Sequence, residues 1–197
     1  VKYKGVNIHE HDQHTGRYVS DETRLKDIEL IKQFNFNSIR LCHYPNARRL
    51  YEMCDEYGLY IVSEMNIETH GISIGNMNRG YTLANNPAWF IPHLDRTING
   101  YLRTRNYASV NLFSLGNEAG NGINFQRTYL YMKNHERLGL NRSVSYERAY
   151  LEFHSDNYAQ MYYSAATLEK LGKDGTDRPV ILWEYSHAMG NSNGNFD

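Results

Sequence analysis

Residues 20–45, SDETRLKDIELIKQFNFNSIRLCHYP, join a helical pattern to a β-rich run, and this unit decides the fold. Either Ser20 or Asp21 suits the N-cap of the helix, acidic residues occupy its first turn, and apolar residues recur at helical spacing in Leu25, Ile28 and Ile31. The run from 37 to 45 then predicts a strand. A helix followed directly by a strand indicates one repeat of an alternating α/β fold.

The same alternation extends in both directions along the chain. A second helix is predicted after Asn46, which is expected to cap it, a third has Pro92 in its first turn, and a fourth covers about 123–137. Seven strands are predicted, at 1–10, 37–45, 59–71, 109–120, 142–147, 160–164 and 178–184. Seven repeats favour a (β/α)8 TIM barrel over an open doubly wound sheet, and no Gly-rich phosphate loop follows the first strand.

A closed barrel of this class needs an eighth strand and typically about 250 residues, whereas the chain has 197. We therefore expect residues 1–197 to be one barrel domain of about seven βα units, without its last strand and belonging to a longer multidomain chain. The start VKYKGV shows neither an initiator methionine nor a signal h-region. A cytoplasmic location is expected on that basis, with a periplasmic or exported parent as the alternative. The isolated barrel, with an open sheet edge, is expected to aggregate.

Composition excludes two kinds of partner. A formal net charge of -1 leaves no basic excess for a nucleic-acid backbone, so no nucleic-acid partner is expected. No run approaches the roughly 18 apolar residues of a membrane span, so no membrane partner is expected either. The cysteines Cys42 and Cys54 have neither metal-type spacing nor a disulfide framework, and we interpret them as two buried thiols.

Two glutamates follow buried runs at the ends of predicted strands. Glu184 follows the apolar residues 180–183, and Glu118 lies at the end of the strand in SLGNEAG. Because the C-terminal ends of barrel strands meet at one mouth, both carboxylates are predicted to face the same cleft, although either one alone could be a solvated strand-end residue. Glycoside hydrolases typically use a pair of carboxyl groups, of which one acts as the acid and the other as the nucleophile or base. The glycines at 116, 120 and 122 are interpreted as room for a substrate to approach the backbone.

A second constellation lies in EMNIETH. Within a strand over 59–71, Glu68 and His70 are two residues apart and face the same way. An oxygen-rich site with one imidazole suits Mg²⁺ or Mn²⁺ better than a tetrahedral Zn²⁺ site. The alternative is a Glu–His pair that is hydrogen-bonded on the face of a strand.

Histidines gather early in the chain, in NIHEHDQH and LCHYPN. His9 and His43 lie at predicted strand ends and are expected at the mouth, whereas His11 and His14 belong to a loop. Four histidines with nearby acids also suit a metallohydrolase barrel. That alternative is weaker, because no metal-bridging lysine or lone terminal aspartate is identifiable on a later strand.

Five ordered motifs, GVNIHEHD, IRLCHYPN, YGLYIVSEMNIETHG, SLGNEAGNG and ILWEYSHAMGN, resemble the central barrel domain of the large bacterial β-galactosidases of glycoside hydrolase family 2. The resemblance covers nearly the whole chain. It implies a retaining enzyme that removes terminal β-D-galactose from oligosaccharides such as lactose through a covalent galactosyl intermediate. It also implies a Mg²⁺ or Mn²⁺ cofactor, and a homo-oligomeric parent whose other domains contact this one and supply a monovalent-cation site.

The resemblance implies roles for individual residues. Glu118 falls at the acid/base position and Glu184 at the nucleophile position, and the implied magnesium ligands are Glu68, His70 and Glu118. Positions that contact the sugar or support the nucleophile match Arg40, His9, His43, Asn117, Tyr162 and His187, with Tyr163 as a competitor to Tyr162. Ser63 stands where the family often has aspartate, so a carboxylate near the metal motif is expected to be missing.

Two other functions are the alternatives. A β-glucuronidase of the same family would need a basic clamp for the substrate carboxylate, and no extra Arg or Lys stands beside the late motifs to supply one. A non-catalytic carbohydrate-binding barrel would have no need of two opposed carboxylates. A retaining β-galactosidase is therefore the expected function.

Overall fold

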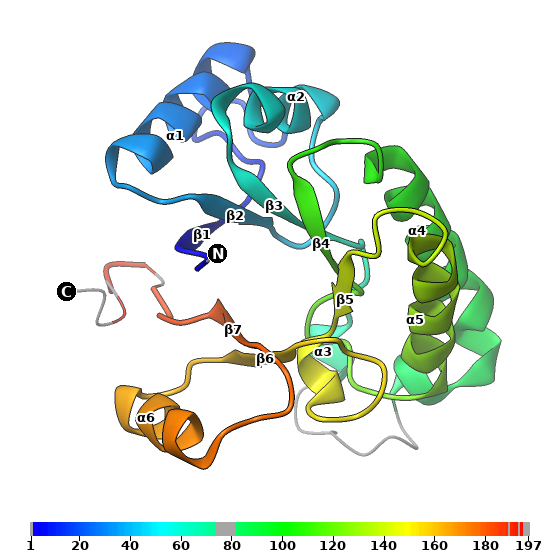
Figure 1. Ribbon diagram of the computed structural model, residues 1–197. Coiled ribbons are helices and arrows are strands. Elements are labelled where there is room, and N and C mark those ends of the chain that lie inside the picture. The colour runs from blue at the N-terminus through cyan, green and yellow to red at the C-terminus, as the bar shows by residue number, and fades with distance from the viewer. Residues whose placement is uncertain (1, 74–81, 189, 193, 195–197) are drawn as a thin grey trace.

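Strands and helices alternate in the computed structural model, which describes residues 2–73, 82–188, 190–192 and 194 (Figure 1). The strands are β1 (Gly5–Ile8), β2 (Ser38–Leu41), β3 (Tyr60–Glu64), β4 (Val110–Ser114), β5 (Ser143–Ser145), β6 (Tyr158–Met161) and β7 (Val180–Glu184). The α-helices are α1 (Asp21–Gln33), α2 (Arg48–Tyr57), α3 (His70–Ser73), α4 (Phe90–Thr104), α5 (Ile123–Glu136) and α6 (Ala165–Asp174). Short 3-10 turns are η2 (Leu83–Asn85), η3 (Pro87–Trp89) and η4 (Glu147–Ala149). All seven predicted strands are present, most of them shorter than predicted.

The strands form two parallel sheets. Strands β1 to β5 are hydrogen-bonded to one another in sequence order, and β6 pairs with β7. Figure 1 shows the strands following one arc, with α1, α2, α4, α5 and α6 outside it. A parallel sheet curved inside a layer of helices is the arrangement of a (β/α)8 barrel, and it confirms the predicted fold class.

Local signals explain where the first two helices begin and end. Ser20 caps α1, because its side chain accepts a hydrogen bond from the Thr23 backbone N–H at 3.2 Å. Gly58 ends α2 in the left-handed conformation, with φ of 70°. The predicted cap at Asn46 is wrong. Ala47 is the N-cap, and the buried Asn46 side chain donates to a nearby backbone carbonyl instead.

The main core lies between the five-stranded sheet and the helices that cover it. All of β2 is buried, as expected for a parallel strand that is covered on both faces. Large rings fill the layer between sheet and helices, with Tyr51, Phe113 and Tyr146 fully buried. Burying a side chain such as Phe113 stabilises the fold by about 1.5–3 kcal/mol. This packing holds the strands rigidly, so that their ends can position side chains.

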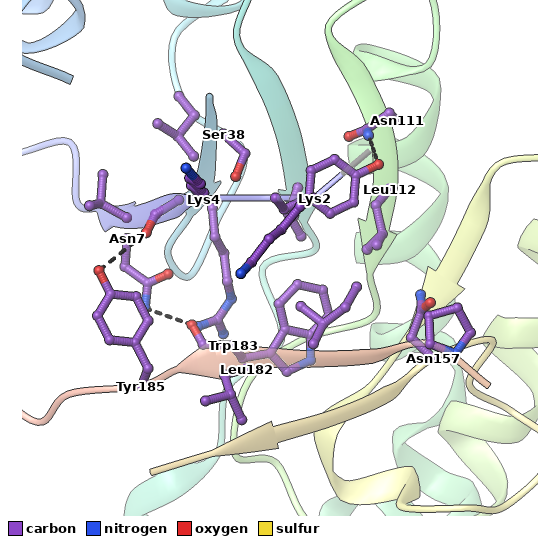
Figure 2. A pocket seen from close by; sticks show the side chains of 18 of the residues that line it. Lys2, Lys4, Asn7, Ser38, Asn111, Leu112, Asn157, Leu182, Trp183 and Tyr185 are labelled. Atoms are coloured by element: carbon purple, nitrogen blue, oxygen red, sulfur yellow. Dashed lines mark hydrogen bonds between the residues drawn. The ribbon is translucent and has the colours of Figure 1, made fainter. Parts of the chain in front are cut away.

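A smaller cluster joins the two sheets. Leu112 of β4 packs with Ala159 of β6 and Trp183 of β7. Side chains also connect β7 to β1, because Asn7 Nδ2 donates to the Trp183 carbonyl at 3.0 Å and the Tyr185 hydroxyl donates to a β1 carbonyl at 3.3 Å (Figure 2). The arc therefore turns back toward its own beginning.

A cavity of about 800 Å³ lies inside the arc, lined by residues of β1 to β5 and β7 (Figure 2). Its lining comes mainly from the first residues of the strands, such as Gly5, Ser38 and Val180. Active sites of (β/α)8 enzymes lie at the opposite, C-terminal ends of the strands. We therefore do not place the functional site in this cavity.

The segment after β3 departs from the predicted strand over 59–71. The strand ends at Glu64, and His70 begins the short helix α3. Between them the chain keeps one isolated parallel bridge, which joins Glu68 to Asn117 in the loop after β4. The prediction that Glu68 and His70 face the same way along one strand is therefore wrong, because the strand ends at Glu64 and His70 begins a helix.

The glycines near Glu118 lie where other segments of the chain pack closely against the backbone. A Cβ on Gly116 would lie 2.5 Å from the Ile67 carbonyl oxygen, and one on Gly122 would lie 2.4 Å from the Cβ of Asn85. A Cβ on Gly120 would lie 2.6 Å from Cγ2 of the Thr82 side chain. The interpretation of these glycines as space for a substrate is wrong, because neighbouring loops fill that space.

Within the described parts of the chain, none of the helices has the length and apolar character needed to cross a membrane.

Candidate active site

Glu184 lies at the C-terminal end of β7 and is held by two side chains. Arg40 Nη1 donates to Glu184 Oε1 at 3.0 Å, and the Tyr162 hydroxyl donates to Glu184 Oε2. The β6–β7 pair brings Tyr162 to this place, since its backbone N–H donates to the Glu184 carbonyl at 2.6 Å. Burial, followed by Glu184 and then Glu118, raises the pKa of the Tyr162 hydroxyl above its ordinary value. The Arg40 guanidinium and the Tyr162 hydroxyl thus hold both oxygens of the Glu184 carboxylate.

Arg40 is the centre of a buried network at the ends of β2, β3 and β7. Its guanidinium donates to Glu64 Oε2 at 2.8 Å and to Asn117 Oδ1 at 2.8 Å, in addition to Glu184. Burial alone would lower the pKa of Arg40, but Glu64 and Glu184 raise it above its ordinary value. Burial would likewise raise the pKa of Glu64, but Arg40 and then His43 hold it below its usual range. Both groups are therefore charged.

The predicted sugar-contacting histidines lie beside this network. His43 Nδ1 is 2.6 Å from Glu64 Oε1, and the His9 ring meets the His43 ring edge-on with centroids 5.2 Å apart. Burial, then His43 and Arg40, lowers the pKa of His9 below its ordinary value. His9 is exposed whereas His43 is partly buried, so the pair forms one wall of the mouth.

Glu118 lies in the loop after β4, with an unusual φ of 38°. Its Oε2 is 2.7 Å from His70 Nδ1, and its Oε1 accepts a hydrogen bond from Arg148 Nη2 at 2.9 Å. The backbone N–H of Glu118 donates to Glu147 Oε1 at 2.6 Å. Carboxylate and backbone are thus both held, and 15% of the side chain is exposed to the mouth.

The predicted metal ligands are brought together. Glu68, His70 and Glu118 each offer a ligand atom, and these atoms all lie within 4.8 Å of one another. Two carboxylates with one imidazole and room for water fit Mg²⁺ or Mn²⁺. Ser63 does not belong to this group, because its hydroxyl bonds with Tyr51 and Thr104 on the helix side of β3. The expected loss of a carboxylate near the metal motif is therefore wrong.

The structure separates the two tyrosine candidates. Tyr162 touches Glu184, whereas the Tyr163 hydroxyl bonds with Tyr158 and Gln160. His187 follows β7, and its ring meets the Tyr162 ring edge-on with centroids 5.5 Å apart. Glu184, Tyr162 and His187 therefore form one side of the mouth. Their catalytic roles stay predictions.

The whole chain, residues 1–197, matches the family model described as glycosyl hydrolases family 2, TIM barrel domain. The chain belongs to this family. Relatives named β-galactosidase are 40% identical in Vibrio vulnificus (strain YJ016) over 98% of the chain, and 41% identical in Alteromonas mediterranea over 100% of it. The chain spans 19% of the length of each of these relatives.

Solved structures of β-glucuronidases have a fold similar to that of this chain. The Ruminococcus gnavus enzyme in complex with D-glucuronic acid has a TM-score of 0.76 and 19% identity, covering 97% of this chain and 36% of that one. The Bifidobacterium dentium enzyme has a TM-score of 0.68 and 22% identity, covering 96% and 34%. At this identity the likeness concerns the fold alone.

Sequence reasoning missed three charged residues of this family 2 barrel. Glu64 ends β3 inside the Arg40 network, and Glu147 and Arg148 follow β5 beside Glu118. Burial raises the pKa of Glu147 to about 8, and Arg148 opposes that rise. The same signal that identified Glu184, a carboxylate directly after a buried strand, also marks Glu64 in YIVSE and Glu147 in SVSYE.

Proposed function

We propose that the chain is the catalytic barrel of a retaining β-galactosidase, which removes terminal β-D-galactose from oligosaccharides such as lactose. The observation that carries the proposal is that the Tyr162 hydroxyl donates to Glu184 Oε2, while Tyr162 and Glu118 line the same small cavity. Relatives that are 40% and 41% identical to this chain are named β-galactosidase, which favours galactose as the sugar.

In the first step, the ionised Glu184 attacks the anomeric carbon while the bond from that carbon to the leaving oxygen breaks. Glu118 gives its proton to the leaving oxygen, so the aglycone departs as an alcohol. Arg40 and the Tyr162 hydroxyl hold Glu184 in place, which aims one carboxylate oxygen at the sugar.

In the second step, Glu118 takes a proton from water, and the water oxygen replaces Glu184 at the anomeric carbon. Two substitutions at one carbon retain its configuration, and Glu118 regains the proton that it needs for the next cycle. His9, His43, Asn117 and His187 lie around this mouth and are proposed to bind sugar hydroxyls. Histidine and amide groups suit such contacts because each can donate or accept.

Glu68, His70 and Glu118 are proposed to hold Mg²⁺, with Mn²⁺ as a substitute. A bound divalent cation supplies positive charge next to the acid/base. The Arg148 guanidinium already reaches Glu118. His70 and Arg148 together keep the Glu118 carboxylate oriented toward the mouth.

β-Glucuronidase is the second candidate, and one observation favours it. Arg148, which follows β5 and does not belong to the late motifs, brings a guanidinium to Glu118. This guanidinium is already paired with Glu118 at 2.9 Å and lies 3.4 Å from Glu147, so a substrate carboxylate would have to compete with two glutamates for it. Galactose therefore remains the proposed sugar.

The first test labels the full-length protein that contains this chain with a 2-deoxy-2-fluoro-β-galactosyl reagent and finds the labelled residue by mass spectrometry. Label on Glu184 is expected, because the fluorine slows the second step and traps the covalent intermediate. Labelling only by a glucurono-configured reagent would replace galactose by glucuronate, and absence of any label with intact sugar binding would favour a non-catalytic barrel.

Matched variants test the two roles. Glu184→Gln should lower kcat by several orders of magnitude, whereas Glu169→Gln, in the exposed Lys173 pair on α6, should leave it unchanged. Glu118→Gln should still form the intermediate from a galactoside with a good leaving group, and added azide should speed its turnover by replacing water. Full activity of Glu184→Gln would contradict the assignment of Glu184 as the nucleophile.

A further inference from the structure

A second group of metal-ligating atoms lies at the mouth, apart from the Glu68 group. His9, Cys42 and His43 each offer one ligand atom, and these atoms all lie within 4.8 Å of one another. We propose that these three residues form a Zn²⁺ site through which zinc inhibits the enzyme. The inhibitory effect rests on the proposed function, but the binding site does not.

The three ligand atoms are close enough to surround one zinc ion after a small movement. With Zn–N near 2.0–2.1 Å and Zn–S near 2.3 Å, ligand atoms of a tetrahedral zinc lie roughly 3.3–3.8 Å apart. The three atoms therefore need to approach by at most about 1.5 Å. His9 is exposed and can move, whereas Cys42 is buried and His43 is partly buried, so the latter two form the fixed part of the site.

His43 already has the outer partner that metal-bound histidines characteristically have. Its Nδ1 lies 2.6 Å from Glu64 Oε1, and Glu64 is itself fixed by Arg40 and Ser114. Coordination through His43 Nε2 leaves this contact in place. A carboxylate in this position sets the orientation of the ring and strengthens its basicity.

The charges around the three ligands favour a cation. The groups that act on His9 are His43, Arg40, Glu68 and Glu184, and those that act on Cys42 include Arg40, Glu64 and Glu184. Glu68 belongs to the proposed Mg²⁺ group, and the remaining carboxylates, Glu64 and Glu184, oppose one guanidinium. A divalent cation is attracted to this surplus of negative charge, although it also experiences repulsion from Arg40.

The donor set selects the metal. One thiolate and two imidazoles suit zinc, whereas Mg²⁺ prefers oxygen ligands. On binding, the Cys42 thiol releases its proton to solvent and its sulfur forms the bond to the metal, so no oxidant or reductant is needed. Three protein ligands leave a fourth position for water, as in open zinc sites.

Zinc at this place would compete with substrate. His9 and His43 are proposed to contact the sugar, and an imidazole that binds zinc through its free nitrogen can no longer bind a hydroxyl. Inhibition by zinc should therefore weaken as the galactoside concentration rises. The predicted Mg²⁺ group uses different residues, so saturating Mg²⁺ should not relieve it.

The binding test uses the full-length protein saturated with Mg²⁺ and titrated with Co²⁺ as a spectroscopic probe for zinc. A thiolate-to-cobalt charge-transfer band and the visible bands of tetrahedral cobalt are expected, and Zn²⁺ should erase both. Cys42→Ser should lose the charge-transfer band, while the matched variant Cys54→Ser, also a buried thiol, should keep it. An unchanged band in Cys42→Ser would overturn the site.

The inhibition test measures the inhibition constant of Zn²⁺ for the same variants. Cys42→Ser should raise it at least about tenfold, and Cys54→Ser should leave it unchanged. If Glu68→Gln rather than Cys42→Ser abolishes inhibition, zinc acts at the Mg²⁺ group and the inhibitory role is wrong. A cobalt band that depends on Cys42 in a protein without galactosidase activity would keep this site and reject the proposed function instead.

Discussion

Glu64 at the end of β3 and Glu147 just after β5 are both buried glutamates, yet their ionisation differs. Glu64 is 0% exposed, and Arg40 with His43 holds its pKa below the ordinary value. Glu147 is 4% exposed, and burial raises its pKa to about 8. The two carboxylates therefore carry different charges at neutral pH.

The difference lies in how many partners each carboxylate has. Glu64 receives the Arg40 guanidinium, the Ser114 hydroxyl and the His43 ring. Glu147 accepts one backbone N–H from Glu118 and lies 3.4 Å from Arg148 Nε, but its Oε2 has no hydrogen-bond partner among the described residues. Burial penalises a charge unless hydrogen bonds and an opposite charge replace the lost water.

The largest expected effect comes from removing the shared cation. Arg40→Met leaves Glu64 and Glu184 without their guanidinium, and breaking such a buried pair costs about 3–5 kcal/mol of unfolding free energy. Urea denaturation of the full-length protein measures the loss. Arg49→Met is the control, because its side chain is 44% exposed and its surface pairs are worth at most about 1 kcal/mol. Equal losses in the two variants would contradict the network.

A smaller effect is expected from Glu64→Gln, which keeps the shape and removes one charge. Because the folded pKa of Glu64 is lowered, its ionised form stabilises the fold above its unfolded pKa near 4.5, and this contribution disappears as pH falls through the folded value. Glu64→Gln should therefore lose about 1–3 kcal/mol at pH 7 and little at the acid end. Parallel pH curves for wild type and variant would contradict this.

The smallest loss of stability is expected from Glu147→Gln, because this variant removes a penalty rather than a favourable contact. The folded pKa near 8 lies above the unfolded value of 4.5, so Glu147 stabilises the folded state most below pH 4.5 and loses that contribution as pH rises to about 8. The wild-type free energy of unfolding should fall across this range by up to about 1.4 kcal/mol per pH unit. Glu147→Gln should remove this part of the slope while retaining an oxygen acceptor for the Glu118 N–H.

Much of the fold was predictable because its signals are local. The Ser20 cap, the Gly58 stop and the strand–helix alternation depend on residues within one or two turns of each other. The prediction failed where a distant segment intervened. The strand after Glu64 gives way to a single bridge with Asn117, and Asn46 turns inward instead of capping α2.

The candidate site was predictable in part. The positions of Glu184 and Glu118 at predicted strand ends indicated that both belong to the site. The family resemblance then implied their roles. Cys42 shows the limit of such reasoning, because its spacing in the sequence indicates no metal site. The fold places His9 from β1's end next to it, and only then do three ligand atoms converge.

The sequence by itself determined the parallel α/β alternation, the start of α1, the end of α2 and the strands that carry carboxylates, because periodicity and capping act over a few residues. Only the tertiary structure decided which charges meet. Arg40 reaches Glu184 across 144 residues of chain, Glu64 gains partners that Glu147 lacks, and Tyr162 rather than Tyr163 touches Glu184. The reason is that the energy of a buried charge depends on its distance through space to other groups and on its exclusion from water, and neither quantity is contained in local sequence.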